Sequence, residues 1–318
     1  MNATGMWFVP ILLAALVAAS GARAAPEVQV SIRPLHALVG SVMAGVGEPG
    51  LLLQGVISPH GIELRPSQAA ALEAADLVVL VGAGLEPFAE RWAVHEDPPR
   101  LLRMSDLPGI RLLPIRSPGP VEDAAGAERE ETHAVTDHRP AGSLDPHLWL
   151  DPANARVLVE AVAAALGEAD TENREKYALN RDRMVAELER LDDWIRAELR
   201  PVKDRPFVVA HDGYRYFTSR YGLAEAGVLA VDPSRIPGAR TLRALRAELV
   251  AVAPACVFTE PGFPPSLVST LTEGIEVESG ALDPLGGGLP SGAGQYEALL
   301  RTLTGSFADC LGRLPEPR

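Results

Sequence analysis

Short apolar runs and longer amphipathic stretches follow each other along the chain, and they predict strands and helices in turn. The first half is predicted to have strands at 28–32, 51–56, 76–81 and 111–115, with helices at 35–44, 67–75 and 86–92. The second half is predicted to have strands at 207–210, 227–231, 256–259 and 276–279, with helices at 214–221, 241–252, 265–271 and 295–311. This alternation predicts an α/β fold with two lobes, each a mostly parallel sheet flanked by helices.

Two further helices are predicted between the halves. Asp151 can cap the first, Pro152 suits its first position, and Gly167 is expected to end it. The second covers 171–199 and has an apolar stripe at helical spacing, formed by Met184, Leu188, Leu191 and Ile195. At 1.5 Å per residue it would span roughly 40 Å, long enough to be a rigid spine between two lobes.

Composition shifts divide the chain into four parts. Residues 1–24 contain an apolar run that is too short to span a bilayer and the small-residue sequence Ala22-Arg23-Ala24, which together predict a cleaved export signal. An N-terminal lobe is predicted at 25–167, a linking spine helix at 168–200 and a C-terminal lobe at 201–318. Within the first lobe, 117–144 is rich in Pro, Gly and acids and is expected to be a mobile acidic loop. No transmembrane segment is expected in the mature chain.

The charge balance argues against a nucleic-acid partner. The chain has 42 acidic and 29 basic residues, a formal net charge of −13, and no visible basic face. An acidic surface suits a soluble protein that attracts cations, although most surface carboxylates are simply solvated. Sequence motifs for nucleotide binding, a serine nucleophile or a zinc protease are absent from the sequence.

The chain has two cysteines, Cys256 and Cys310. In an exported protein an even number of cysteines favours a disulfide, and the alternative is two buried free thiols.

Three of the seven histidines and one aspartate lie just after predicted strands or at junctions between segments. These residues are His60, His147, His211 and Asp283. Ligands of open α/β sheets bind beyond the carboxyl ends of the strands, and two candidates come from each half, so the four could meet between the lobes. Imidazoles and a carboxylate are suitable zinc ligands. However, the residues lie far apart in sequence, and structural histidines with ordinary hydrogen bonds are the alternative reading.

Six segments in this order resemble the zinc-binding (ZnuA-like) proteins of bacterial high-affinity zinc ABC importers, in the metal-binding cluster of solute-binding proteins. They are Ser31-Ile32-Arg33-Pro34-Leu35-His36, Ser58-Pro59-His60 with Leu64-Arg65-Pro66-Ser67, Asp145-Pro146-His147-Leu148-Trp149-Leu150-Asp151-Pro152, Ala210-His211-Asp212-Gly213-Tyr214 followed by Tyr216-Phe217, Val257-Phe258-Thr259-Glu260-Pro261, and Leu282-Asp283-Pro284-Leu285-Gly286. The resemblance covers nearly the whole mature chain.

The resemblance implies two lobes bridged by one long helix, with a metal site in the cleft between them. It implies His60, His147 and His211 as zinc ligands, Asp283 as the carboxylate position, and a disulfide between Cys256 and Cys310. The implied function is capture of Zn²⁺ in the periplasm and its delivery to a membrane permease by a monomeric protein that is not an enzyme.

Two departures and two alternatives bear on this reading. Some relatives carry an acidic residue where this chain has Pro59, which leaves the fourth ligand to Asp283 or to water. The 117–144 loop holds only His133 and His138, so it is either an auxiliary metal site or a plain solvated loop. Manganese or iron capture is one alternative function, although His211 stands where manganese-type relatives often have a carboxylate, which favours zinc. A zinc-dependent hydrolase is the other.

Overall fold

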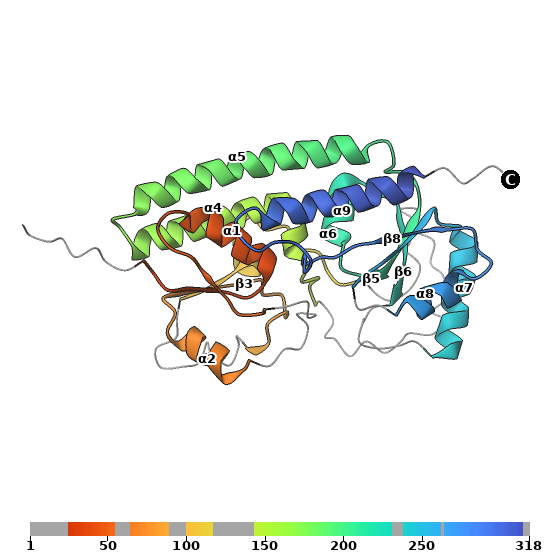
Figure 1. Cartoon of the computed structure of the whole chain (residues 1–318), viewed down its shortest axis with the longest axis horizontal. Coiled ribbons are helices and arrows are strands. Elements are labelled where there is room, and N and C mark those ends of the chain that lie inside the picture. The colour runs from red at the N-terminus through yellow and green to blue at the C-terminus, as the bar shows by residue number, and fades with distance from the viewer. Residues whose placement is uncertain are drawn as a thin grey trace, which may run out of the picture.

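The computed structural model describes residues 25–54, 64–88, 100–116, 143–230, 238–261 and 264–313. These residues form two four-stranded sheets in which every strand pair is parallel. The first sheet has the order β2-β1-β3-β4, and the second has the order β6-β5-β7-β8. The two halves therefore repeat one topology without a repeat in sequence, and the predicted α/β class is confirmed (Figure 1).

The strands of the first sheet are β1 (Val28–Val30), β2 (Gly50–Leu51), β3 (Leu77–Leu80) and β4 (Arg100–Arg103). Those of the second are β5 (Phe207–His211), β6 (Glu225–Ala230), β7 (Cys256–Thr259) and β8 (Glu278–Ala281). The central strands β3 and β5 are buried at every position, because helices cover both faces of a parallel sheet.

Helices α1 (Arg33–Met43), α2 (Pro66–Glu73) and α4 (Pro152–Ala169) accompany the first sheet. Helices α6 (Arg215–Tyr221), α7 (Ala239–Val252) and α8 (Pro265–Thr272) accompany the second. Single 3₁₀ turns form at Met104–Asp106 and Leu148–Leu150. Among the described residues, no helix is both long enough and apolar enough to cross a membrane.

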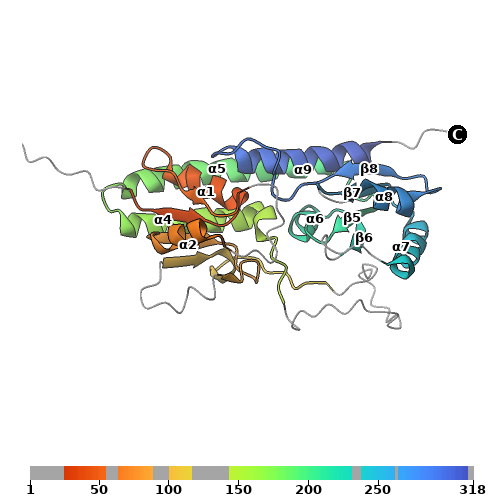
Figure 2. The ribbon, with the colours of Figure 1, turned by 60° about the horizontal axis from the view of Figure 1, so that its bottom comes forward.

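The long helix α5 (Arg174–Leu199) is the predicted spine. It packs on α1 and α4 near the first sheet and on α6 near the second, and its predicted apolar stripe is buried. The last helix, α9 (Gln295–Gly312), lies beside α5 and also contacts both α1 and β8 (Figures 1 and 2). Helix α5 therefore links the two halves along the chain, and α9 packs against elements of both halves.

The predicted strand at 111–115 is wrong, and the fourth strand of the first sheet is β4 instead. Side chains bond to the backbone at 111–113, and the Leu113 carbonyl accepts from the backbone amide of Asp145 (2.9 Å). The amide of Arg111 donates to Asn154 Oδ1 (2.8 Å), its carbonyl accepts from Asn154 Nδ2 (3.1 Å), and the amide of Leu113 donates to Tyr216 Oη (2.8 Å). Only an isolated bridge between Pro114 and Leu144 remains, since proline has no amide to donate to a sheet.

Helix α4 begins as predicted but ends later than predicted. Asp151 Oδ1 accepts from the Ala153 amide (2.9 Å), which confirms the cap. Gly167 stays inside the helix, which continues to Ala169. Arg174 packs over Gly167 and donates to its carbonyl (3.0 Å), so the helix end is fixed by a contact from α5 and not by the glycine.

A partly buried ionic cluster connects α4, α5 and α6. Arg220 of α6 contacts Asp151 at the start of α4 (3.0 Å) and Asp192 of α5 (2.6 Å), and the hydroxyl of Tyr221 donates to Asp192 (2.8 Å). Asp151 is only 1% exposed, so separating it from Arg220 would leave a buried charge without its partner. This cluster disfavours large movement of the second lobe along the spine.

Asn180 provides a test of how α5 is fixed to the first lobe. Its Nδ2 donates to the carbonyls of Val42 and Ala44, both at 2.9 Å, where α1 ends. Replacing Asn180 with alanine leaves these carbonyls without that donor, and we expect the free energy of unfolding to fall by about 2 kcal/mol. Urea unfolding measures this change, and Glu189→Ala on the exposed face of α5 is the control that should change it little. Equal stability of both variants would contradict the expectation.

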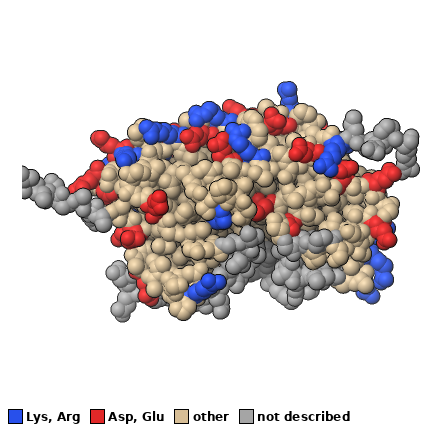
Figure 3. All heavy atoms as spheres, viewed as in Figure 1, with Lys and Arg blue, Asp and Glu red and all other residues tan. Residues whose placement is uncertain are grey.

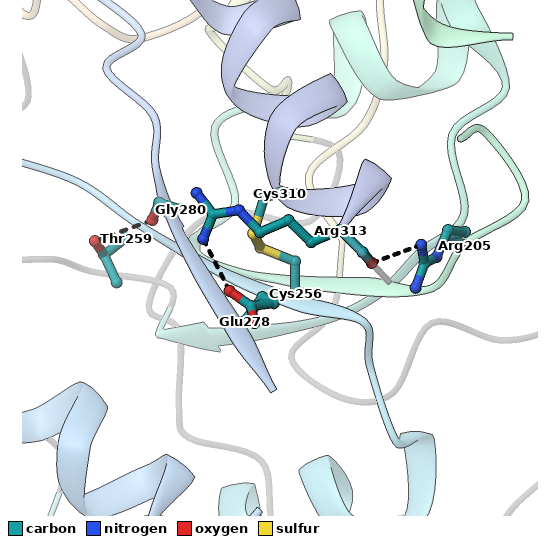
Figure 4. The surroundings of a disulfide bond; sticks show 7 residues. All are labelled: Arg205, Cys256, Thr259, Glu278, Gly280, Cys310 and Arg313. Atoms are coloured by element: carbon teal, nitrogen blue, oxygen red, sulfur yellow. Dashed lines mark hydrogen bonds and ion pairs between the residues drawn. A yellow bond between two sulfur atoms is a disulfide. The ribbon is translucent and has the colours of Figure 1, made fainter. Parts of the chain in front are cut away.

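The two cysteines form a disulfide between β7 and α9 (Figure 4). Cys256 and Cys310 are separated by 54 residues in sequence, and both are buried. The prediction of a bridge is therefore confirmed, and it fixes the last helix to the second sheet.

Candidate metal site

His147 lies between the two sheets and is oriented by Asp145. Asp145 Oδ1 accepts from His147 Nδ1 (2.8 Å) and from the His147 amide (3.0 Å), and His147 is 3% exposed. An ionised carboxylate can only accept, so Nδ1 carries a proton, and in the neutral imidazole Nε2 carries the lone pair that a metal would use. Burial alone would raise the pKa of the Asp145 carboxyl, but the hydrogen bond and charge of His147 outweigh it and hold that pKa below its usual value.

His211 is the last residue of β5, at the carboxyl end of a parallel strand. Its Nδ1 lies 3.1 Å from Glu260 Oε1, and the Tyr214 hydroxyl donates to the same oxygen at 2.7 Å. By the same reasoning, Nδ1 donates, and Nε2 has the lone pair in the neutral ring. Burial alone would lower the pKa of His211, but the hydrogen bond and charge of Glu260 outweigh it and raise that pKa.

The two imidazoles face each other. Their ring centroids are 5.0 Å apart, and the ring planes are inclined by 73°. Two imidazoles bound through Nε2 to one tetrahedral zinc would have centroids about 5 Å apart, given a Zn–N distance of about 2 Å. A Cβ atom placed on Gly213 would lie 3.2 Å from His147 Nε2 and 2.9 Å from His211 Cε1, so both rings border the space beside this glycine. The spacing of this pair fits shared coordination of one zinc ion.

Asp283 follows β8, and its carboxylate is bound by the backbone of its own turn. Oδ1 accepts from the amides of Leu285 (2.9 Å) and Gly286 (3.0 Å), and Oδ2 accepts from the amide of Gly287 (2.7 Å). Burial raises the pKa of Tyr214 well above its ordinary value, and the charges of Glu260 and Asp283 raise it further. The two carboxylate oxygens of Asp283 are therefore held by three backbone donors of its own turn.

Residues of the second lobe hold the His147 segment in place. The Tyr216 hydroxyl donates to the Asp145 carbonyl (3.1 Å), and Trp149 Nε1 donates to the Pro284 carbonyl (2.7 Å). Arg33 of α1 donates to the Leu289 carbonyl (2.6 Å) in the same connection between β8 and α9. The imidazole pair thus forms where the two lobes meet.

The described residues contain part of the predicted ligand set. His60 lies outside them, as do the auxiliary candidates His133 and His138. Among the described residues, no three His, Cys, Asp or Glu side chains form a ready metal-holding group. His36 is a hydrogen-bonded residue of α1, because its Nε2 bonds to the Pro49 carbonyl (2.9 Å).

Sequence reasoning assigned no role to Asp145 or Glu260. A signal existed for each, because Asp145 stands two residues before His147 and Glu260 directly follows the strand β7. Since β7 pairs with β5 in parallel, Glu260 emerges at the same sheet edge as His211.

Figure 3 shows acids and bases interspersed over the visible face that α5 crosses, with no broad basic patch there.

Comparison with known proteins identifies the family. The profile described as "ZnuA: Zinc-uptake complex component A periplasmic" matches residues 28–310. The chain belongs to the ZnuA family. A high-affinity zinc uptake system protein ZnuA of Brucella suis is 35% identical, with 98% of this chain and 99% of that protein covered.

Solved ZnuA structures agree with this family assignment. A ZnuA crystal structure matches with a TM-score of 0.72 and 26% identity, covering 90% of this chain and 99% of that chain. A ZnuA deletion mutant with zinc bound matches with the same score and identity, covering 92% of this chain and all of that one. The two-lobe fold is thus shared with ZnuA.

Proposed function

We propose that this chain captures Zn²⁺ in the periplasm and delivers it to the permease of a zinc ABC importer. The observation that carries the proposal is the pair His147 and His211, whose rings lie at the spacing of two zinc ligands and whose Nδ1 atoms are each bound by a carboxylate. Membership of the ZnuA family and the zinc in a ZnuA structure of the same fold support the choice of metal.

The proposed ligand set is His60, His147, His211 and Asp283. The three imidazoles provide the nitrogen donors that zinc accepts readily, and Asp283 or a water provides the oxygen. Asp283 can offer the zinc ion only a lone pair that is not already in use, because its two oxygens accept hydrogen bonds from three backbone amides.

The same contacts favour a binding protein over a hydrolase. Asp145 and Glu260, which directly contact the two imidazoles, both accept Nδ1 protons. This arrangement orients ligands, whereas a hydrolase requires a carboxylate or imidazole placed to take a proton from water. We further propose that the chain acts as a monomer, that residues 1–24 direct its export, and that it does not catalyse a reaction.

Delivery would proceed with little movement between lobes. The Arg220 cluster and the bonds made by Trp149 and Arg33 cross between elements of the two halves. We therefore propose that release occurs by local rearrangement of the ligand segments when the loaded protein docks on its permease.

Titration of Zn²⁺ into the metal-free mature chain tests the proposal. We expect one zinc per chain with a dissociation constant below micromolar, and competition that favours Zn²⁺ over Mn²⁺. Isothermal calorimetry measures the first and competition with a coloured chelator the second. Binding no tighter than micromolar would refute zinc capture, and a preference for Mn²⁺ would refute the assigned metal.

A further inference from the structure

Tyr214, Glu260 and His211 form a chain of contacts that ends at the metal site. His211 closes β5, Glu260 follows β7, and Tyr214 immediately precedes α6. One carboxylate oxygen, Glu260 Oε1, receives both the Tyr214 hydroxyl (2.7 Å) and His211 Nδ1 (3.1 Å). Tyr214 is 1% exposed, so its hydroxyl is shielded from bulk water. The two donors together hold this carboxylate in one orientation.

The position of Glu260 determines what it can do for a metal. It contacts the ring of His211 at Nδ1, whereas the ion would bind on the opposite side at Nε2. Glu260 can therefore fix the tautomer and raise the basicity of the ligand nitrogen. To become a ligand itself, it would have to leave both His211 and Tyr214. A free carboxylate at this place would provide the oxygen donor that Mn²⁺ prefers.

We propose that Tyr214 and Glu260 are positioning residues that set the selectivity of this site for zinc over manganese. Glu260 holds His211 as a nitrogen donor with its lone pair on Nε2. Tyr214 keeps Glu260 beside the imidazole and prevents it from reaching the ion. This inference rests on the proposed function, since it concerns the metal preference of the same site.

Two conservative variants test the inference in the full mature chain. Glu260→Gln removes the charge that fixes the tautomer, and we expect zinc affinity to fall 10- to 100-fold, the range typical for a lost partner of a ligating histidine. Tyr214→Phe removes only the hydroxyl, and we expect the ratio of zinc to manganese affinity to fall about tenfold as Glu260 becomes free to move. The double variant should have the same ratio of zinc to manganese affinity as Glu260→Gln alone, because the Tyr214 hydroxyl acts through the Glu260 carboxylate.

Tyr177→Phe is the matched control. Tyr177 is also buried, and its hydroxyl donates to a carboxylate, Asp170 Oδ2, at 3.0 Å. This variant should lower stability in the same way without changing either metal affinity. The visible absorption of bound Co²⁺ gives a second readout, which should change in the Tyr214 and Glu260 variants and not in the Tyr177 variant.

The outcomes separate the inference from the proposed function. If the unaltered chain fails to bind zinc, the proposed function fails. If the unaltered chain binds zinc and both variants keep its zinc affinity, its metal ratio and its Co²⁺ spectrum, the inference fails while zinc capture stands. Thermal unfolding of the metal-free variants tests whether each is folded. If Glu260→Gln or Tyr214→Phe does not fold, the metal affinities and Co²⁺ spectrum of the other variant test the inference.

Discussion

Replacing His211 or His147 with alanine is expected to weaken zinc binding at least roughly a thousandfold, equivalent to about 4 kcal/mol of binding free energy. Each change removes one nitrogen donor from the ion, and it also leaves a carboxylate, the partly buried Glu260 or the buried Asp145, without its imidazole partner. The measurement is zinc titration by calorimetry, with circular dichroism to verify the fold.

His36→Ala is the control for these variants. This histidine belongs to α1 and bonds to the Pro49 carbonyl, so its loss should alter stability slightly and zinc affinity not at all. Zinc binding by the His147 or His211 variant that equals that of the His36 variant would show that the imidazole pair does not bind the ion.

The second large effect concerns the disulfide. Replacing Cys256 and Cys310 with alanine together removes a link that closes a loop of 54 residues, and we expect the free energy of unfolding to fall by about 4 kcal/mol in the chain-entropy treatment. Zinc affinity should be retained, because Cys256 begins β7 and Glu260 follows its other end, about 13 Å away at the usual rise of a strand.

Urea unfolding of the double variant measures this loss of stability. The unaltered chain unfolded in the presence of a thiol reductant should show the same midpoint, since both lack the link in the unfolded state. A double variant as stable as the oxidised chain would show that α9 is held by packing alone, against the aromatic group of Phe207, Phe258 and Phe307.

The secondary structure was largely predictable because its signals are local. The apolar period of 171–199 identified the spine, and Asp151 with Pro152 marked the start of α4. The prediction of a strand at 111–115 was wrong because distant residues bond to this backbone. The amides of Arg111 and Leu113 donate to Asn154 and Tyr216, which the local sequence pattern does not reveal. The edge strand β4 has arginine at both ends, so it lacked the apolar pattern of a central strand.

The candidate site likewise has some features that the sequence predicts and others that only the structure reveals. His147 and His211 could be selected from the sequence, because each stands at a junction where a predicted strand or segment ends. The sequence by itself also determined the α/β alternation and the amphipathic face of the spine, and it favoured a disulfide between the two cysteines. These properties depend on residue type and on neighbours within a few positions.

Only the tertiary structure decided which carboxylate serves which imidazole, that Tyr214 holds Glu260, and that Asp283 binds the backbone of its own turn. The physical reason is that a hydrogen bond is directional and acts over about 3 Å. Its partners are therefore set by how strands β5 and β7 and the connection after β8 pack together, and residues distant in sequence carry no local sign of that packing.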